Sequence, residues 1–266
     1  MKIGIVGCAG RMGRMLVATV LETAGADLAG GTEQPGSEAI GQDVAVLAGG
    51  DTTGLAVGDD PAALFQQSDV VIDFTAPAAT VAHAAMAAET GTALVAGTTG
   101  LASEDDAALA QAAERTVILR AANFSIGVNL MLGLTEQVAG LLGDDYDIEI
   151  VEMHHRHKVD APSGTALAIG EAAAKGRGVN LEDVSERVRD GITGARRAGD
   201  IGFATLRGGD VTGEHSAIFA TDGERIEITH KAANRGLFAK GAIRAALWTA
   251  GQPAGLYSMR DVLGFS

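Results

Sequence analysis

The sequence contains little cysteine, little proline and few aromatic residues. Cys8 is the only cysteine among 266 residues, so no disulfide can form within the chain. Disulfides form in oxidising compartments, so a chain without them fits a reducing compartment. The start MKIGIVG also lacks the basic and apolar segments of a signal peptide, and we therefore expect a cytoplasmic protein. Glycine, threonine and charged residues interrupt every alanine-rich stretch before about 18 apolar residues accumulate, so we expect no membrane association.

Positive charge is also scarce. Lys and Arg number 20 against 34 Asp and Glu, which gives a formal net charge of −14. This balance does not suit a general nucleic-acid binder, because the phosphate backbone is held mainly by lysine and arginine. Any anion that the protein binds must therefore meet a local group of positive charges.

Aromatic residues make up only 4% of the chain, whereas 47% is hydrophobic and mostly Ala, Val, Ile and Leu. Such a composition favours helices packed on a buried sheet over an aromatic-rich β-sandwich. The length allows one large domain or two of ordinary size. In the first half, short apolar runs alternate with alanine-rich stretches, as in βαβ units with a parallel sheet. We expect strands at 2–6, 26–31, 68–74, 92–96 and 116–121, and helices at 11–23, 61–66, 77–89 and 104–114.

The pattern changes after about residue 125. Residues 126–142 predict one long helix, whereas 147–153 and 224–230 alternate apolar and polar residues, as strands with one wet face do. Asp222-Gly223 predicts a hairpin turn, because both central positions of a type I′ turn need positive φ. The second region is therefore expected to be an α+β domain with a mixed or antiparallel sheet.

Two further segments carry structural expectations. Residues 237–249 predict a final amphipathic helix that could return to the first domain. The stretch 175–200, rich in glycine and charge, is the best candidate for a mobile loop.

A glycine-rich turn joins the first expected strand to the first expected helix. Gly7, Gly10 and Gly13 are spaced G-x-x-G-x-x-G, and Ala9 stands at the middle place of the commoner G-x-G-x-x-G motif. Glycines let a backbone approach a pyrophosphate, and a helix N-terminus offers free N–H groups and partial positive charge. Arg11 and the nearby Arg14 add cations, so this turn is a candidate dinucleotide site.

An acidic residue strengthens this interpretation. Glu33 lies about 20 residues beyond Gly13, where a carboxylate would hold the adenosine ribose hydroxyls. The alternative is an ordinary tight turn with Glu33 as a solvated loop residue. Gln34 follows where an arginine could grip a 2′-phosphate, so NADH should serve at least as well as NADPH unless Arg11 or Arg14 compensates.

Two later loops each follow an expected parallel strand, at the sheet edge where ligands bind in open α/β folds. Their small residues and backbone amides could hold the nicotinamide, although ordinary connecting loops are an equally good interpretation of either alone. They are Gly97-Thr98-Thr99-Gly100 and Ala121-Ala122-Asn123-Phe124-Ser125.

Half of the six histidines fall in the run His154-His155-Arg156-His157-Lys158, which directly follows an alternating strand. A zinc site is disfavoured, since no cysteine lies near and no further ligand has a recognisable spacing, so we expect no metal. A solvated charge run is the other alternative.

The segment after this run favours a binding site instead. Ser163-Gly164-Thr165 opens an alanine-rich helix at 166–174, and its N–H groups and hydroxyls could form an anion pocket. Cations beside a helix N-terminus suit a substrate with carboxylates and a step that requires proton donation.

These segments closely resemble 4-hydroxy-tetrahydrodipicolinate reductases, also called dihydrodipicolinate reductases. The resemblance spans almost the whole chain, and its most specific part is the run from Glu152 to Ala166, EMHHRHKVDAPSGTA. Further matching segments are GCAGRMG at 7–13, DFT at 73–75, GTTG at 97–100, AANFS at 121–125, IGFAT at 201–205, GEH at 213–215 and ITHKA at 228–232.

The resemblance implies a Rossmann-like dinucleotide-binding domain at 1–125 and 236–266, and a substrate-binding and tetramerisation domain at 126–235. It implies a homotetramer that reduces 4-hydroxy-tetrahydrodipicolinate, a cyclic dicarboxylate, to tetrahydrodipicolinate with loss of water. NADH or NADPH would be the reductant, and the reaction belongs to the diaminopimelate route to lysine.

The resemblance also assigns roles to residues. His154 would donate or accept a proton and Lys158 would donate one, while His155, Gly164 and Thr165 would bind substrate. Two departures, Gln34 and Ala76 in place of basic residues, argue against a strong NADPH preference. The cofactor-binding positions would be Gly7, Cys8, Ala9, Gly10, Arg11, Met12, Glu33, Gly97, Thr98, Thr99, Ala121, Ala122, Asn123 and Phe124.

Two other functions are alternatives. Aspartate-semialdehyde and homoserine dehydrogenases share the two-domain plan, but the first needs a nucleophilic cysteine near the substrate, and Cys8 lies in the expected phosphate turn. A module that senses NADH without turnover would leave the cluster from His154 to Lys158 unexplained.

Overall fold

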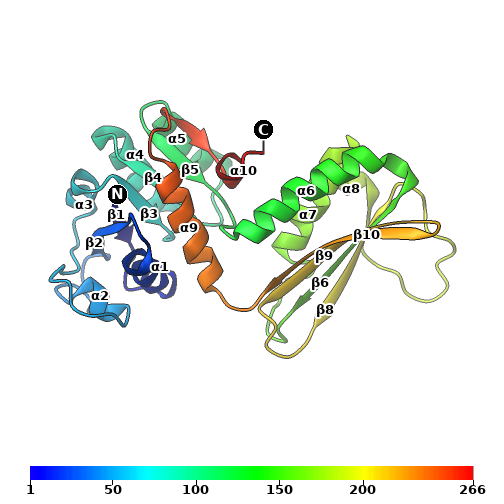
Figure 1. The fold of residues 1–266 in the computed structure, drawn as a ribbon, viewed down its shortest axis with the longest axis horizontal. Coiled ribbons are helices and arrows are strands. Elements are labelled where there is room, and N and C mark those ends of the chain that lie inside the picture. The colour runs from blue at the N-terminus through cyan, green and yellow to red at the C-terminus, as the bar shows by residue number, and fades with distance from the viewer. Residues whose placement is uncertain (266) are drawn as a thin grey trace. The chain divides into compact units, whose positions relative to one another are not determined.

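The computed structural model describes residues 1–265 and divides into two compact units (Figure 1). The first unit comprises Met1–Ile126 and the segment from Gly236 onward, and the second comprises Gly127–Arg235. Each unit has its own sheet and its own core. The assignment of cofactor binding to one unit, and of substrate binding and tetramer formation to the other, stays a prediction.

The first unit contains a six-stranded parallel sheet in the order β11-β5-β4-β3-β1-β2. Every residue of β3 and β4 is buried, as expected for strands covered on both faces. The predicted parallel α/β fold is therefore confirmed. Its strands are β1 (Lys2–Val6), β2 (Asp27–Thr32), β3 (Val70–Asp73), β4 (Ala93–Ala96), β5 (Val117–Arg120) and β11 (Gly255–Tyr257).

Helices cover both faces of this sheet. On one face, Leu16 of α1 and Ala242 of α9 pack with Ile5 in one core. On the other face, Phe65 of α3 and Leu109 of α5 belong to a second core. The helices are α1 (Arg11–Glu22), α2 (Val44–Leu47), α3 (Pro61–Gln67), α4 (Pro77–Thr90), α5 (Ser103–Ala113), α9 (Gly236–Trp248) and α10 (Met259–Leu263).

The second unit contains a five-stranded mixed sheet in the order β10-β9-β6-β8-β7. β6 pairs antiparallel with β9 and parallel with β8, and the predicted β9–β10 hairpin turns at Gly223, whose φ is 90°. The predicted mixed sheet is therefore confirmed. The strands are β6 (Asp147–His154), β7 (Ser185–Glu186), β8 (Ile201–Arg207), β9 (Gly213–Thr221) and β10 (Glu224–Ala232).

Helices pack against this second sheet. Met131 of α6 and Ile169 of α7 share a core with Ile150 of β6. The helical segments are α6 (Ile126–Leu142), the 3₁₀ turn η1 (Gly143–Asp145), α7 (Gly164–Arg177) and α8 (Leu181–Val184). The stretch Ile126–Asp145 is long and apolar enough to cross a membrane by length and composition alone, with a mean hydropathy of 1.3. Core helices of soluble proteins meet the same criterion, and two residues of α6 line the core here, Met131 and Ala139.

The prediction of one loop at 175–200 was wrong, because its start belongs to α7 and it also contains α8 and β7. Gly176, one of the glycines of this stretch, lies inside α7, where a Cβ would be 2.2 Å from the Glu136 carbonyl oxygen of α6. The glycine thus permits close helix packing. Arg189 and Arg196 also tie the remaining loop to Glu149, with N–O distances of 2.8 and 2.9 Å.

Candidate active site

The glycine-rich turn connects β1 to α1, as predicted. Gly7 has a φ of 66°, and its N–H donates to the Thr32 carbonyl oxygen at 2.8 Å. A Cβ at Gly13 would lie 2.1 Å from the Gly7 carbonyl oxygen, so only glycine lets α1 begin this close to the turn. Gly10 is the N-cap and offers no capping side chain, which leaves the first N–H groups of α1 for a ligand. This turn fits the pyrophosphate of a dinucleotide.

Glu33 lies directly after β2 and is hydrogen-bonded to the turn. Its Oε1 accepts a hydrogen bond from the Ala9 N–H at 2.8 Å, and Arg14 Nε donates to the Ala9 carbonyl oxygen at 2.8 Å. Burial and the nearby Glu33 charge raise the pKa of Cys8 to about 12, so its thiol stays protonated near neutral pH. Cys8 is therefore no nucleophile, which also disfavours an aspartate-semialdehyde dehydrogenase. Two more predicted residues, exposed Arg11 and half-buried Met12, form the start of α1.

A buried carboxylate supports the predicted loop at 97–100. Asp73, at the end of β3, is fully buried and lies 2.8 Å from His83 Nδ1 of α4. Its Oδ1 accepts hydrogen bonds from the Thr75 N–H at 2.8 Å and from the Thr98 hydroxyl at 3.4 Å. Burial raises the pKa of Asp73, but the hydrogen bonds from His83 and Thr75 outweigh it and hold the pKa below its usual value. Asp73 belongs to the matching segment DFT at 73–75, but its role in supporting the loop at 97–100 is visible only in the structure.

The structure brings the two predicted nicotinamide loops together. A Cβ at Gly97 would lie 2.3 Å from the Phe74 ring, and that ring lies 5.2 Å from the ring of Phe124. The Ala121 N–H donates to the Ala96 carbonyl oxygen at 3.1 Å. Asn123 Oδ1 accepts from the Ser125 N–H at 2.8 Å, whereas Ala122 and Thr99 are exposed. Both loops therefore meet at the carboxyl ends of β4 and β5.

In the second unit, β6 ends at His154, so the rest of the cationic run lies after the strand. Alternation along β6 places Glu152 and His154 on its buried face. Glu152 is 1% exposed and its Oε2 lies 2.6 Å from His154 Nδ1. Burial raises the pKa of Glu152, but hydrogen bonds from Arg207, His154 and Ser163 outweigh it and hold the pKa low.

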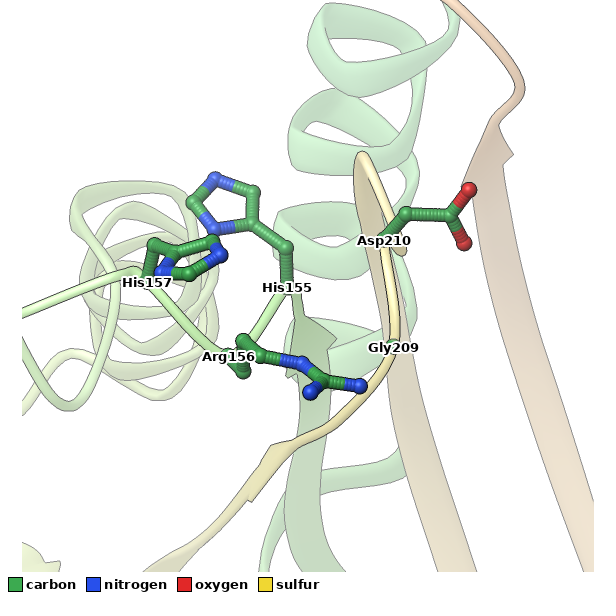
Figure 2. A pocket seen from close by; sticks show the side chains of 5 residues that line it. All are labelled: His155, Arg156, His157, Gly209 and Asp210. Atoms are coloured by element: carbon green, nitrogen blue, oxygen red, sulfur yellow. The ribbon is translucent and has the colours of Figure 1, made fainter.

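The residues after β6 line a pocket of about 740 Å³ together with Gly209 and Asp210 (Figure 2). His155 and His157 place their rings side by side, with centroids 6.2 Å apart, while the Asp210 carboxylate points away from them. His155 Nδ1 is buried and has no hydrogen-bond partner within residues 1–265. A polar atom left unpaired beside a pocket is a candidate ligand contact.

Lys158 does not line this pocket. Its Nζ lies 2.8 Å from Asp160 Oδ1, and this ammonium holds the pKa of Asp160 below its usual value. Lys158 therefore forms an ion pair with Asp160, although its neighbours in the run from His154 to Lys158 are basic residues.

The helix N-terminus predicted to bind an anion is present at α7. Ser163 is its N-cap, and the Ser163 hydroxyl oxygen accepts from the Ala166 N–H at 3.1 Å and lies 3.1 Å from His215 Nε2. Ser163 is buried, whereas Gly164 is exposed and Thr165 half-buried. The two predicted substrate residues are thus the outward ones.

Sequence reasoning missed three residues of this site: Glu152, Arg207 and His215. The only available signal was the charge of Glu152 at an inward position of an alternating strand. Burial, then the charge of His154, lowers the pKa of His215 to about 4, so this imidazole is neutral near neutral pH. Among residues 1–265, no group of three or more His, Cys, Asp or Glu side chains is placed to hold a metal ion.

A parallel sheet with a glycine-rich turn after its first strand, and a second unit with a pocket lined by His155, Arg156 and His157, are typical of two-domain oxidoreductases that use a nicotinamide cofactor. Residues 1–124 match the model of the dihydrodipicolinate reductase N-terminus, and residues 127–263 match that of its C-terminus. The chain belongs to the dihydrodipicolinate reductase family.

Named relatives cover almost the whole chain. The 4-hydroxy-tetrahydrodipicolinate reductase of Ruegeria pomeroyi is 56% identical over 262 residues, which are 98% of this chain and 97% of that one. The enzyme of the same name from Rhodopseudomonas palustris strain HaA2 is 54% identical over 266 residues, 100% and 98% of the two chains. A dipicolinate-bound dihydrodipicolinate reductase from Paenisporosarcina sp. TG-14 is 25% identical, with a TM-score of 0.77 over 97% of each chain. These comparisons confirm the predicted family, its reductase class and a nicotinamide cofactor.

Proposed function

We propose that this reductase converts 4-hydroxy-tetrahydrodipicolinate to tetrahydrodipicolinate and water, in the diaminopimelate route to lysine. The cationic run after β6, beside the N-terminus of α7, carries this proposal, because a ring with two carboxylates needs paired positive and N–H donor groups. Relatives above half identity bear the name of this activity, and the related structure holds dipicolinate, a ring with two carboxylates.

The substrate-binding residues in this proposal are His155, Gly164 and Thr165. His155 lines the 740 Å³ pocket with an unpaired Nδ1. A Cβ at Gly164 would meet open space among the described residues, so the first turn of α7 is accessible to a carboxylate. The N–H groups of this turn and the imidazole donate hydrogen bonds that favour the charged form of the substrate.

Lys158 and His154 carry the proton transfers. The reaction adds one hydride and one proton to the substrate, and the 4-hydroxyl group leaves together with a ring proton as water. Lys158 protonates the carbanion that hydride addition creates, and Asp160, 2.8 Å away, stabilises the ammonium that must be restored afterwards. His154, held through Nδ1, keeps its Nε2 for proton exchange.

The residues that hold the cofactor are the glycine turn, Glu33 and the loops at 97–99 and 121–124. The reduced nicotinamide supplies the hydride. Glu33 is a carboxylate at the ribose position, and Gln34 beside it is exposed and uncharged. We therefore propose that NADH serves at least as well as NADPH.

The proposal extends to the assembly and the location of the enzyme. We propose a homotetramer because of the family resemblance, and a cytoplasmic enzyme because its single cysteine is buried and unpaired. Light scattering during size-exclusion chromatography measures the assembly directly.

The function is tested by following the absorbance of reduced nicotinamide after mixing the protein with freshly made substrate. Oxidation of NADH that depends on the substrate and gives tetrahydrodipicolinate supports the proposal. Tight NADH binding without turnover would instead identify a cofactor-sensing module.

A further inference from the structure

Glu152 is a buried carboxylate with three different partners in the second unit. Besides His154 Nδ1, it accepts two hydrogen bonds from Arg207 of β8, at 2.8 and 2.9 Å. It also accepts the Ser163 N–H at 3.0 Å. The N–H comes from the N-cap of α7, so one side chain joins two strands and a helix start.

The contacts continue from Arg207 to Lys158. Arg207 Nη2 also donates to the Asp160 carbonyl oxygen at 2.7 Å, and the Asp160 carboxylate binds Lys158 Nζ at 2.8 Å. Glu152 thus contacts one proposed proton-transfer group directly and is linked to the other through two residues. It also fixes the residue that precedes the proposed substrate positions, Gly164 and Thr165.

We propose that Glu152 is a positioning residue for the reaction, an inference that rests on the proposed function. Its carboxylate selects the His154 tautomer that is protonated on Nδ1, because an ionised carboxylate only accepts hydrogen bonds. The free Nε2 of His154 then faces the proton exchange. The same carboxylate holds the start of α7 and, through Arg207 and Asp160, the ammonium of Lys158.

Access to His154 Nε2 is the second observation behind this proposal. A Cβ at Gly213 of β9 would lie 3.0 Å from Nε2, so the glycine leaves room beside that nitrogen. The charged and titratable groups that contact or pair with His154 are Glu152, His215 and Arg207, which lies opposite His154 on β8. Of these, Glu152 makes the hydrogen bond to the ring.

The test uses Glu152→Gln, which keeps the side-chain shape and removes the charge. We expect kcat to fall about 10- to 100-fold while the KM for NADH changes by less than about two-fold, since the glycine turn is untouched. The matched control is Glu149→Gln on the same strand, where arginines also bind the carboxylate but on the other face. This control should retain the wild-type kcat.

A spectroscopic measurement separates positioning from simple folding. ¹⁵N NMR of histidine rings in the full-length wild-type protein should show neutral His154 protonated on Nδ1, and Glu152→Gln should lose that single tautomer. Neutral wild-type His154 protonated on Nε2 overturns the proposal even if the variant fails to fold. So does a folded Glu152→Gln enzyme with unchanged kcat.

A different result would show that the proposed function, rather than the role of Glu152, is wrong. If wild-type protein does not reduce 4-hydroxy-tetrahydrodipicolinate with either cofactor, the function is wrong, and the NMR result still decides whether Glu152 sets the His154 tautomer.

Discussion

The Glu33 carboxylate accepts a hydrogen bond from the Ala9 N–H at 2.8 Å, which ties the end of β2 to the glycine turn after β1. This bond fixes the Glu33 carboxylate at the position proposed for the adenosine ribose. A ribose hydroxyl can donate to such a carboxylate, whereas a 2′-phosphate is repelled by it. The contact thus gives the cofactor preference a physical cause.

Gln34→Arg should shift the preference toward NADPH. An arginine beside Glu33 can pair with the 2′-phosphate and offset the carboxylate, so kcat/KM for NADPH should rise about ten-fold relative to NADH. Steady-state kinetics with both cofactors measures the ratio. Gln66→Arg, which adds the same charge at an exposed position of α3, should leave it unchanged. An equal response in both variants would contradict a local effect at Glu33.

Lys158→Ala should lower kcat by about 100-fold or more, because the proton donor is lost. The KM for NADH should stay close to its wild-type value, since the cofactor turn belongs to the other unit. Lys175→Ala removes an exposed lysine of α7 that pairs with Glu136, and we expect wild-type turnover there. Unchanged turnover in Lys158→Ala would remove this residue from the mechanism.

The fold class could be predicted because its signals are local. β4, and β3 up to its last residue Asp73, are continuous apolar runs, as buried parallel strands usually are, and the Asp222-Gly223 pair predicts a hairpin turn. The prediction of a loop at 175–200 was wrong because the contacts that shape this stretch are not local in the sequence. Gly176 breaks a helix by local preference, but its close approach to Glu136 of α6 is a tertiary contact that periodicity does not contain.

Gly213→Ala should reduce kcat about ten-fold through crowding of His154 Nε2. The added Cβ would lie 3.0 Å from that nitrogen and 3.4 Å from Cδ2 of the same ring, so the His154 ring must shift slightly. The control is Gly208→Ala, whose Cβ would meet only the flexible Met153 Cε, at 3.2 Å. The measurement is kcat of both variants, with circular dichroism to verify that each is folded. Equal activities would show that Nε2 needs no free space.

Stability should fall in acid because of His215. Its pKa is about 4 in the folded protein and 6.5 in the unfolded chain, so only the unfolded chain takes up this proton between these pH values. Stability from this group is complete above pH 6.5 and is lost as the pH falls toward 4, by about 3 kcal/mol.

Urea unfolding across this pH range measures the effect. His215→Gln should show a shallower loss of unfolding free energy than wild type, and His157→Gln, at an exposed ring, should follow the wild-type curve. Parallel curves for wild type and His215→Gln would show that His215 titrates normally in the fold.

The candidate site divides into a part that the sequence predicts and a part that it does not. Contiguous motifs such as the run from His154 to Lys158 can be recognised because their chemistry lies in adjacent residues. Arg207 and His215 reach Glu152 and Ser163 only through strand pairing across β6, β8 and β9. Such contacts depend on register, which no local pattern specifies.

The central claim is that this chain transfers a hydride from reduced nicotinamide to the substrate ring with loss of water. The most direct measurement is mass spectrometry of the product formed from 4-hydroxy-tetrahydrodipicolinate and NADH dideuterated at C4 of the nicotinamide. We predict tetrahydrodipicolinate that carries a single deuterium and lacks the 4-hydroxyl oxygen. A product without deuterium, or no product while NADH binds, would contradict the account.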